Sequence, residues 1–193
     1  TMSNTNSPAG RIMLKNVRLA FPNLFEPSTV AGEGEPRYSA AFILPTDHPQ
    51  IKEIQAKIKA VATEKWKDKA DAQITALNKT GKVALHDGDE KPQYDGFPGN
   101  MFISASAKVS ARPTVIDANK SPLTERDGKP YAGCFVNVSL DFWAQDNAYG
   151  KRVNAQLRGV QFLRDGDAFS AGRPADSDEF EAVTEGADAD DIA

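Results

Sequence analysis

Three segments in the second half of the chain alternate between apolar and polar side chains. Opposite the apolar side chains, they carry flat aromatic rings among amides, hydroxyls and cations. Bases of an unpaired nucleic acid stack on such rings, and its phosphates bind lysine and arginine, so this combination is typical of a surface for single-stranded polynucleotides. The candidates for base stacking and phosphate contact on these segments are Phe102, Lys108, Phe135, Trp143, Arg152, Asn154 and Arg158.

Two tyrosines, Tyr38 and Tyr149, lie at a predicted strand and at a predicted turn and are further candidates for base stacking. A second interpretation stays open for every ring, because phenylalanine and tryptophan are mostly buried in folded proteins. Phe135 and Trp143 could be covered by a helix or by long loops, and they would then belong to the core.

Few residue patterns in the sequence are typical of catalytic sites. Neither of the two histidines, His48 and His86, has the neighbourhood of a Ser-His-Asp site, and no glycine-rich phosphate loop is present. Oxygen donors close in sequence can share a divalent cation, and a metal-dependent nuclease that uses Asp87, Asp89 and Glu90 is one alternative function. Acidic loops with a glycine are usually only turns, so we expect no catalytic residue, no metal and no cofactor.

A sheet is needed to hold these side chains in one surface. Short alternating or apolar runs bounded by glycine and proline predict strands at 11–20, 37–44, 101–109, 134–143 and 152–158. Residues 146–150 are expected to join the last two strands as a hairpin. Between Pro49 and Asn78 the apolar residues recur every three or four positions, which predicts an amphipathic helix. Residues 21–36 are broken by proline and glycine and predict a long loop.

Length and composition fit one domain with a core. The chain has 193 residues, of which 40% are hydrophobic, and no apolar run is long enough for a membrane helix. The single cysteine, Cys134, excludes an intramolecular disulfide and indicates a reducing, intracellular setting.

The net charge of −4 is unevenly distributed. Residues 1–175 carry +4, and the last 18 residues carry −8 with no basic residue among them. So acidic a segment cannot bury enough apolar surface to fold, and we expect it to be disordered and available to a basic surface. The alternative is that it only keeps the protein soluble. The expected organisation is a flexible N-terminus (1–10), one folded domain (11–175) and an acidic tail (176–193).

Six sequence blocks stand in a distinctive order along the chain: 86–90 (HDGDE), 102–105 (FISA), 112–117 (RPTVID), 131–138 (YAGCFVNV), 142–147 (FWAQDN) and 159–166 (GVQFLRDG). In this order the blocks resemble those of the tailed-phage single-stranded-DNA-binding proteins. The resemblance extends over residues 11–180.

This resemblance implies a mainly β protein, an OB-fold-like barrel of five strands with one long helix and extended loops. It also implies sequence-independent binding of single-stranded DNA during phage replication or recombination, in the cytoplasm of the infected bacterium. Members often use an acidic tail to recruit replication or recombination proteins of phage or host, which here assigns partner binding to Asp188, Asp190, Asp191 and Ile192.

Two features depart from the family pattern. An OB barrel normally has its helix between the third and fourth strands, whereas the helix predicted here follows only two. Either residues 21–36 contain a further strand or the barrel is modified. The classical recruiting tail also ends in an aromatic residue, and this chain ends in Ile192 and Ala193. A β-rich structural or protein-binding component without DNA binding is the remaining alternative.

Overall fold

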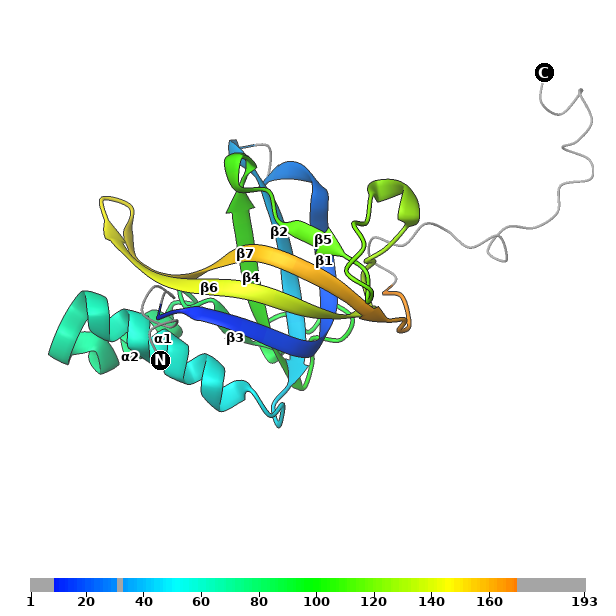
Figure 1. Ribbon diagram of the computed structural model, residues 1–193. Coiled ribbons are helices and arrows are strands. Elements are labelled where there is room, and N and C mark those ends of the chain that lie inside the picture. Colours follow the sequence, from blue (N-terminus) through cyan, green and yellow to red (C-terminus); the bar gives the residue numbers. More distant parts are fainter. Residues whose placement is uncertain (1–8, 31–32, 170–193) are drawn as a thin grey trace, which may run out of the picture.

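The computed structural model describes residues 9–30 and 33–169 (Figure 1). The predicted acidic tail and residues 1–8 of the predicted flexible N-terminus lie outside the described residues. The strands are β1 (Arg11–Val30), β2 (Glu33–Pro45), β3 (Leu85–Asp87), β4 (Asn100–Lys108), β5 (Thr114–Ile116), β6 (Phe135–Asn147) and β7 (Gly150–Arg164). The α-helices are α1 (Ile51–Trp66) and α2 (Ala70–Lys79), joined by a 3₁₀ turn, Lys67–Lys69.

Five of the strands close into a barrel. The sheet order is β3-β4-β2-β1-β6-β7-β5, and an additional pairing of β4 with β7 joins the two sides. That closing pair is parallel, with Ser106 opposite Gln156, whereas the other pairs within the barrel are antiparallel. The ring of β1, β2, β4, β7 and β6 confirms the predicted five-stranded barrel, to which β3 and β5 add short outer strands.

The prediction of a loop at 21–36 is wrong, because β1 continues to Val30 and forms a long hairpin with β2. In this segment β1 pairs with β2 at Asn23–Ser39 and at Ser28–Arg37. This pairing keeps the segment extended although its residues favour turns. Pro22 and the next proline, at 27, fall within the register shifts of this ladder, where a strand tolerates a missing N–H.

The predicted amphipathic helix is confirmed as α1 and α2. Ile54, Ile58, Val61 and Ala62 of α1 are buried against the barrel, and Trp66 Nε1 donates a hydrogen bond to Asp146 Oδ2 at 2.9 Å. In the chain, the helices lie between the second and third barrel strands, β2 and β4. Since the described residues before α1 contain no barrel strand besides β1 and β2, the barrel is a modified version of the usual OB order.

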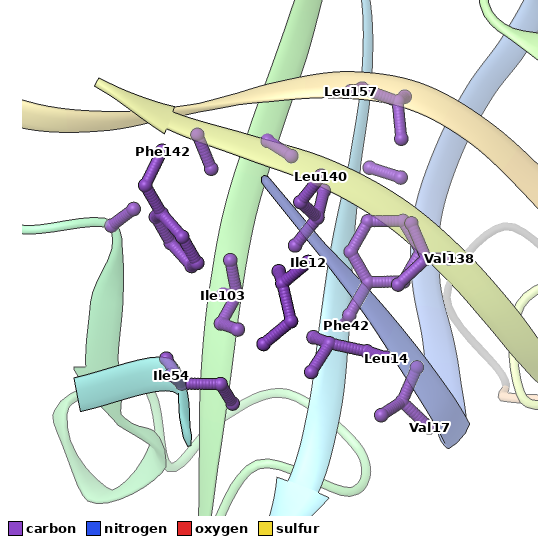
Figure 2. Packing of buried hydrophobic residues seen from close by; sticks show 14 of the residues in the cluster. Ile12, Leu14, Val17, Phe42, Ile54, Ile103, Val138, Leu140, Phe142 and Leu157 are labelled. Atoms are coloured by element: carbon purple, nitrogen blue, oxygen red, sulfur yellow. The ribbon is translucent and has the colours of Figure 1, made fainter. Parts of the chain in front are cut away.

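One core fills the barrel. Ile12, Leu14 and Val17 of β1, Phe42 of β2, Ile103 of β4, Val138, Leu140 and Phe142 of β6 and Leu157 of β7 meet Ile54 of α1 in its interior (Figure 2). The inward faces of 101–109, 134–143 and 152–158 were predicted from their alternation, and the buried positions of β6, Val136 to Phe142, follow it. The opposite face of the same strands is therefore the outer surface of the barrel. Among the described residues no helix is long and apolar enough to cross a membrane.

Candidate nucleic-acid interface

A groove of about 920 Å³ lies over the outer surface of the barrel, where β2, β4, β7 and β6 contribute adjacent side chains. Its floor is made of small residues, because Ser39 and Ala41 of β2 face Ser106 and Ser104 of β4 in register. Such short side chains leave the space above the sheet open to flat groups.

Aromatic rings stand along this groove. Trp143 on β6 is 45% exposed and lies opposite Asn154 on β7. Phe21 on β1 is 41% exposed, and its ring meets Tyr94 edge to face with a centroid separation of 4.8 Å. The backbone of Phe21 has a φ of 48°, a conformation that few phenylalanines adopt and that structures keep mainly at functional sites or sharp bends.

Cations occupy both ends of the groove. Arg37 and Lys108 are cross-strand partners on β2 and β4, and both are exposed. Arg152, also exposed, lies towards the opposite end of β7, across from Gln145. Of the described residues that line the groove, Asp141 alone carries a carboxylate, and it pairs with Arg11 at 3.5 Å. The groove is therefore suited to an anionic ligand.

His86 adds a ring beside Arg152. It stacks on Phe102 with centroids 4.8 Å apart, and its Nδ1 lies 3.9 Å from Glu90. Burial lowers the pKa of His86 below its ordinary value; Glu90 opposes this shift, and Arg152 and Lys91 add to it. A neutral, flat ring therefore lines this end of the groove at neutral pH.

Comparison with known proteins assigns the chain to a family. Residues 10–193 match the family model described as the ssDNA-binding protein of Enterobacter phage Enc34. The chain belongs to this family. The family is described by its binding of single-stranded DNA. The chain is also 50% identical over 177 residues to putative protein p50 of Acyrthosiphon pisum secondary endosymbiont phage 1, covering 90% of this chain and 94% of that protein.

Solved structures agree with this family assignment. The single-stranded DNA-binding protein from bacteriophage Enc34 in complex with ssDNA matches with a TM-score of 0.70 and 28% identity, over 84% of this chain and 90% of that chain. The same phage protein in a second structure has a TM-score of 0.66, 29% identity and coverage of 90% and 91%. Bacteriophage T7 gp2.5, a single-stranded DNA binding protein, has a TM-score of 0.57 at 13% identity, covering 90% and 98%, and shares the fold.

Four of the nine predicted DNA-binding residues come together in the groove of this family member. They are Lys108, Trp143, Arg152 and Asn154. Tyr149 is 92% exposed at the tip of the β6–β7 hairpin, which extends away from the barrel on the side of α1 and α2 (Figure 1). Arg158 is exposed on β7 outside the groove, where its Nη1 donates to Ser139 Oγ at 3.1 Å.

Two of the predicted stacking residues are buried in the structure and are not available to a base there. Tyr38 is only 6% exposed because it is on the inward face of β2, within the main core. Phe102 is 5% exposed because two rings cover it. His86 stacks on the ring of Phe102, and Phe97 packs against the same ring with a centroid distance of 4.7 Å. Phe135 lies outside the groove, half-buried, and its ring is contacted by the guanidinium groups of Arg164 at 3.9 Å and Arg18 at 5.5 Å.

Among the aromatic rings and cations that line the groove, sequence reasoning missed three. Phe21 lies within the segment interpreted as a loop and Arg37 directly after it, so the β1–β2 hairpin that brings both residues to the groove was not predicted. His86 was considered only as a catalytic or metal-binding residue. Asn23, Ser39 and Ser106 are partners across β1, β2 and β4. Recognition of the β1–β2 hairpin would have shown that these polar residues lie on one face with the groove.

The acidic residues proposed for a nuclease shape their own loop. Asp87 Oδ1 accepts a hydrogen bond from Asp89 N at 2.9 Å, and Asp89 Oδ1 accepts one from Gly99 N at 2.8 Å. Within the described ranges, no group of three His, Cys, Asp or Glu side chains is arranged to hold a metal ion. The contacts of these residues support a turn, which was the simpler interpretation of this loop.

Proposed function

We propose that this chain binds single-stranded DNA without reading its sequence and protects it during phage DNA replication or recombination. The observation that carries the proposal is the groove itself, which combines the exposed Trp143 with Lys108 and Arg152 above a floor of small residues. The likeness to the Enc34 protein in complex with ssDNA supports the same ligand.

The DNA bases bind by stacking on exposed aromatic rings. Trp143 and Phe21 present exposed rings along the groove, and Tyr149 presents one at the hairpin tip. Each stacked base contributes about 1–3 kcal/mol irrespective of its identity, because every base has a flat face. Phosphates then meet Arg37, Lys108 and Arg152, with the amide of Asn154 between them. Such contacts hold the strand without selecting a sequence.

We infer that the acidic tail competes with DNA for these cations. Its predicted partner-binding residues, Asp188, Asp190, Asp191 and Ile192, lie outside the described residues. Covalent attachment keeps the tail at a high effective concentration, and DNA would displace it and release it to a basic partner protein. Deletion of residues 176–193 is expected to tighten DNA binding, most strongly at low salt. A deletion variant that binds DNA no more tightly than the full chain would contradict this inference.

The proposed function is tested by titrating a fluorescently labelled oligo-dT and a duplex of equal length, each with and without Mg²⁺. We expect tighter binding of the single strand, no dependence on Mg²⁺ and no cleavage. Equal or tighter binding of the duplex would contradict the proposal, because a stacking groove needs unpaired bases. Cleavage that requires Mg²⁺ would favour the nuclease, and absence of binding at low salt would favour a structural component.

A further inference from the structure

The polar outer face of β6 and β7 continues beyond the groove. Asp141 and Gln156, a cross-strand pair, are among the groove residues. Ser139 and Gly159 form the next pair on the same face of the ladder, beyond the inward-facing pair of Leu140 and Leu157, and belong to a second hollow of about 240 Å³. Side chains on one face of a strand repeat about every 6.6 Å. A DNA strand lying in the groove therefore reaches this hollow by extending one such repeat along the outer face.

Arg158 lies at the junction between the groove and the hollow. Ser139 pairs with Gly159 and the next residue of β6, Leu140, pairs with Leu157, so Arg158 is the extra residue of a β-bulge. A bulge redirects a side chain, and bulges are frequent beside functional sites. The exposed guanidinium of Arg158 has no described carboxylate within ion-pair distance. Its charge is therefore available to an anion.

The hollow has two kinds of lining. Met13, which is 51% exposed, and Ile116 contribute apolar atoms. Asn137 and Gln161 contribute amides that hold each other, since Asn137 Nδ2 donates to Gln161 Oε1 at 3.2 Å. No carboxylate is among the lining residues that the structure describes.

Size and charge indicate the ligand. Pockets that enclose a whole small ligand measure about 300–1,000 Å³, so the hollow suits one flat group of a larger molecule. Apolar atoms beside polar amides suit a nucleobase, and a guanidinium at the rim suits the phosphate attached to it. Continuity with the groove favours a nucleotide of the same strand over a separate ligand.

We propose that the hollow formed by Met13, Ile116, Asn137, Gln161 and Arg158 is a second nucleotide subsite, which receives single-stranded DNA as it leaves the groove past Gln156. This inference rests on the proposed function, because it extends the path of the same ligand. It predicts that Arg158 matters only for strands long enough to reach beyond the groove.

The test compares two labelled oligo-dT lengths, about 5 and about 16 nucleotides, which span the range of sites on single OB folds. Arg158→Ala is expected to weaken binding of the longer strand about five- to tenfold and of the shorter strand less than about twofold. Met13→Glu, which adds a carboxylate at an exposed position, is expected to have the same length-dependent effect without destabilising the fold. Lys65→Ala removes one exposed cation from α1 and is the control, with equal small effects on both lengths.

The outcomes separate this inference from the function on which it rests. If the wild-type chain binds neither length at low salt, the proposed function fails. If it binds both and neither Arg158→Ala nor Met13→Glu changes the affinity for the longer strand, the subsite is refuted and the function stands. Equal losses on both lengths also refute a separate subsite, because Arg158 would then contact DNA within the groove.

Discussion

The guanidinium group of Arg18 lies over the ring of Phe169, with Cζ 4.3 Å from the ring centre. Its Nε donates to the carbonyl oxygen of Gly133 at 2.9 Å and its Nη2 to that of Asp167 at 2.7 Å. Phe169 itself is 7% exposed and packs with Phe97 and Phe102 in a second apolar cluster. Residues 165–169, the described segment after β7, are therefore held against β1 and pack with the folded domain.

The contact between Arg18 and Phe169 predicts that removal of the Phe169 ring lowers the stability of the fold. Phe169→Ala should lower the free energy of unfolding by about 3 kcal/mol, because it leaves a cavity beneath Gly96 and removes the surface on which Arg18 lies. Chemical denaturation measures the change. Val109→Ala, at a position 52% exposed, is the control and should change stability by less than about 0.5 kcal/mol. Equal small losses for both variants would show that the ring contributes nothing.

Trp143→Ala should weaken binding of oligo-dT by about 1–3 kcal/mol while leaving thermal stability nearly unchanged, because this exposed ring is proposed to stack on a base. Trp66→Phe leaves Trp143 as the single tryptophan, and oligo-dT should then quench its fluorescence. If Trp143→Ala lowers stability and the folded fraction binds normally, the ring has a structural role.

Arg152→Ala should reduce the slope of log affinity against log salt by about 0.7, the value for one phosphate contact on a single strand. The reason is its exposed position at the end of the groove beside His86. Titrations over a series of salt concentrations measure the slope. Lys65→Ala changes the net charge equally but lies on α1, and its slope should match that of the wild type. Identical slopes for Arg152→Ala and Lys65→Ala would show that Arg152 does not contact a phosphate.

Burial of His86 predicts a pH dependence of stability. Because its folded-state pKa is lowered from 6.5, the unfolded chain takes up a proton first as the pH falls. The contribution of the neutral ring is complete above pH 6.5 and is lost as the pH falls through the folded-state pKa. His86→Phe keeps a ring on Phe102 and should lose less stability than the wild type below pH 6.5.

Glu90→Gln provides the matched variant for His86. Glu90 raises the pKa of His86, whereas burial, Arg152 and Lys91 lower it. Without the carboxylate the folded-state pKa should fall further, and the loss of stability should extend to lower pH. Denaturation of the three proteins between pH 7.5 and about pH 5 shows the difference. Parallel curves for wild type and His86→Phe would mean that His86 does not titrate in this window.

Alternation and periodicity along the sequence were enough to predict the inward faces of β4, β6 and β7 and the amphipathic α1. These patterns report burial directly, because one face of each element must leave water. The blocks from His86 to Gly166 also carried the family resemblance. The polar outer face of Trp143, Arg152 and Asn154 was visible for the same reason, as the complement of the core.

Long-range pairing decided the rest. The prolines of 21–36 indicate a loop locally, yet the ladder between β1 and β2 outweighs them and brings Phe21 and Arg37 to the groove. Tyr38 and Phe102 have the same composition signals as Trp143, but their neighbours in space cover them and leave Trp143 exposed. The sequence by itself determined which faces are apolar and which chemistry the polar faces offer. Only closure of the barrel through Ser106 and Gln156 decided which rings and cations share one groove, because those contacts join residues far apart in the chain.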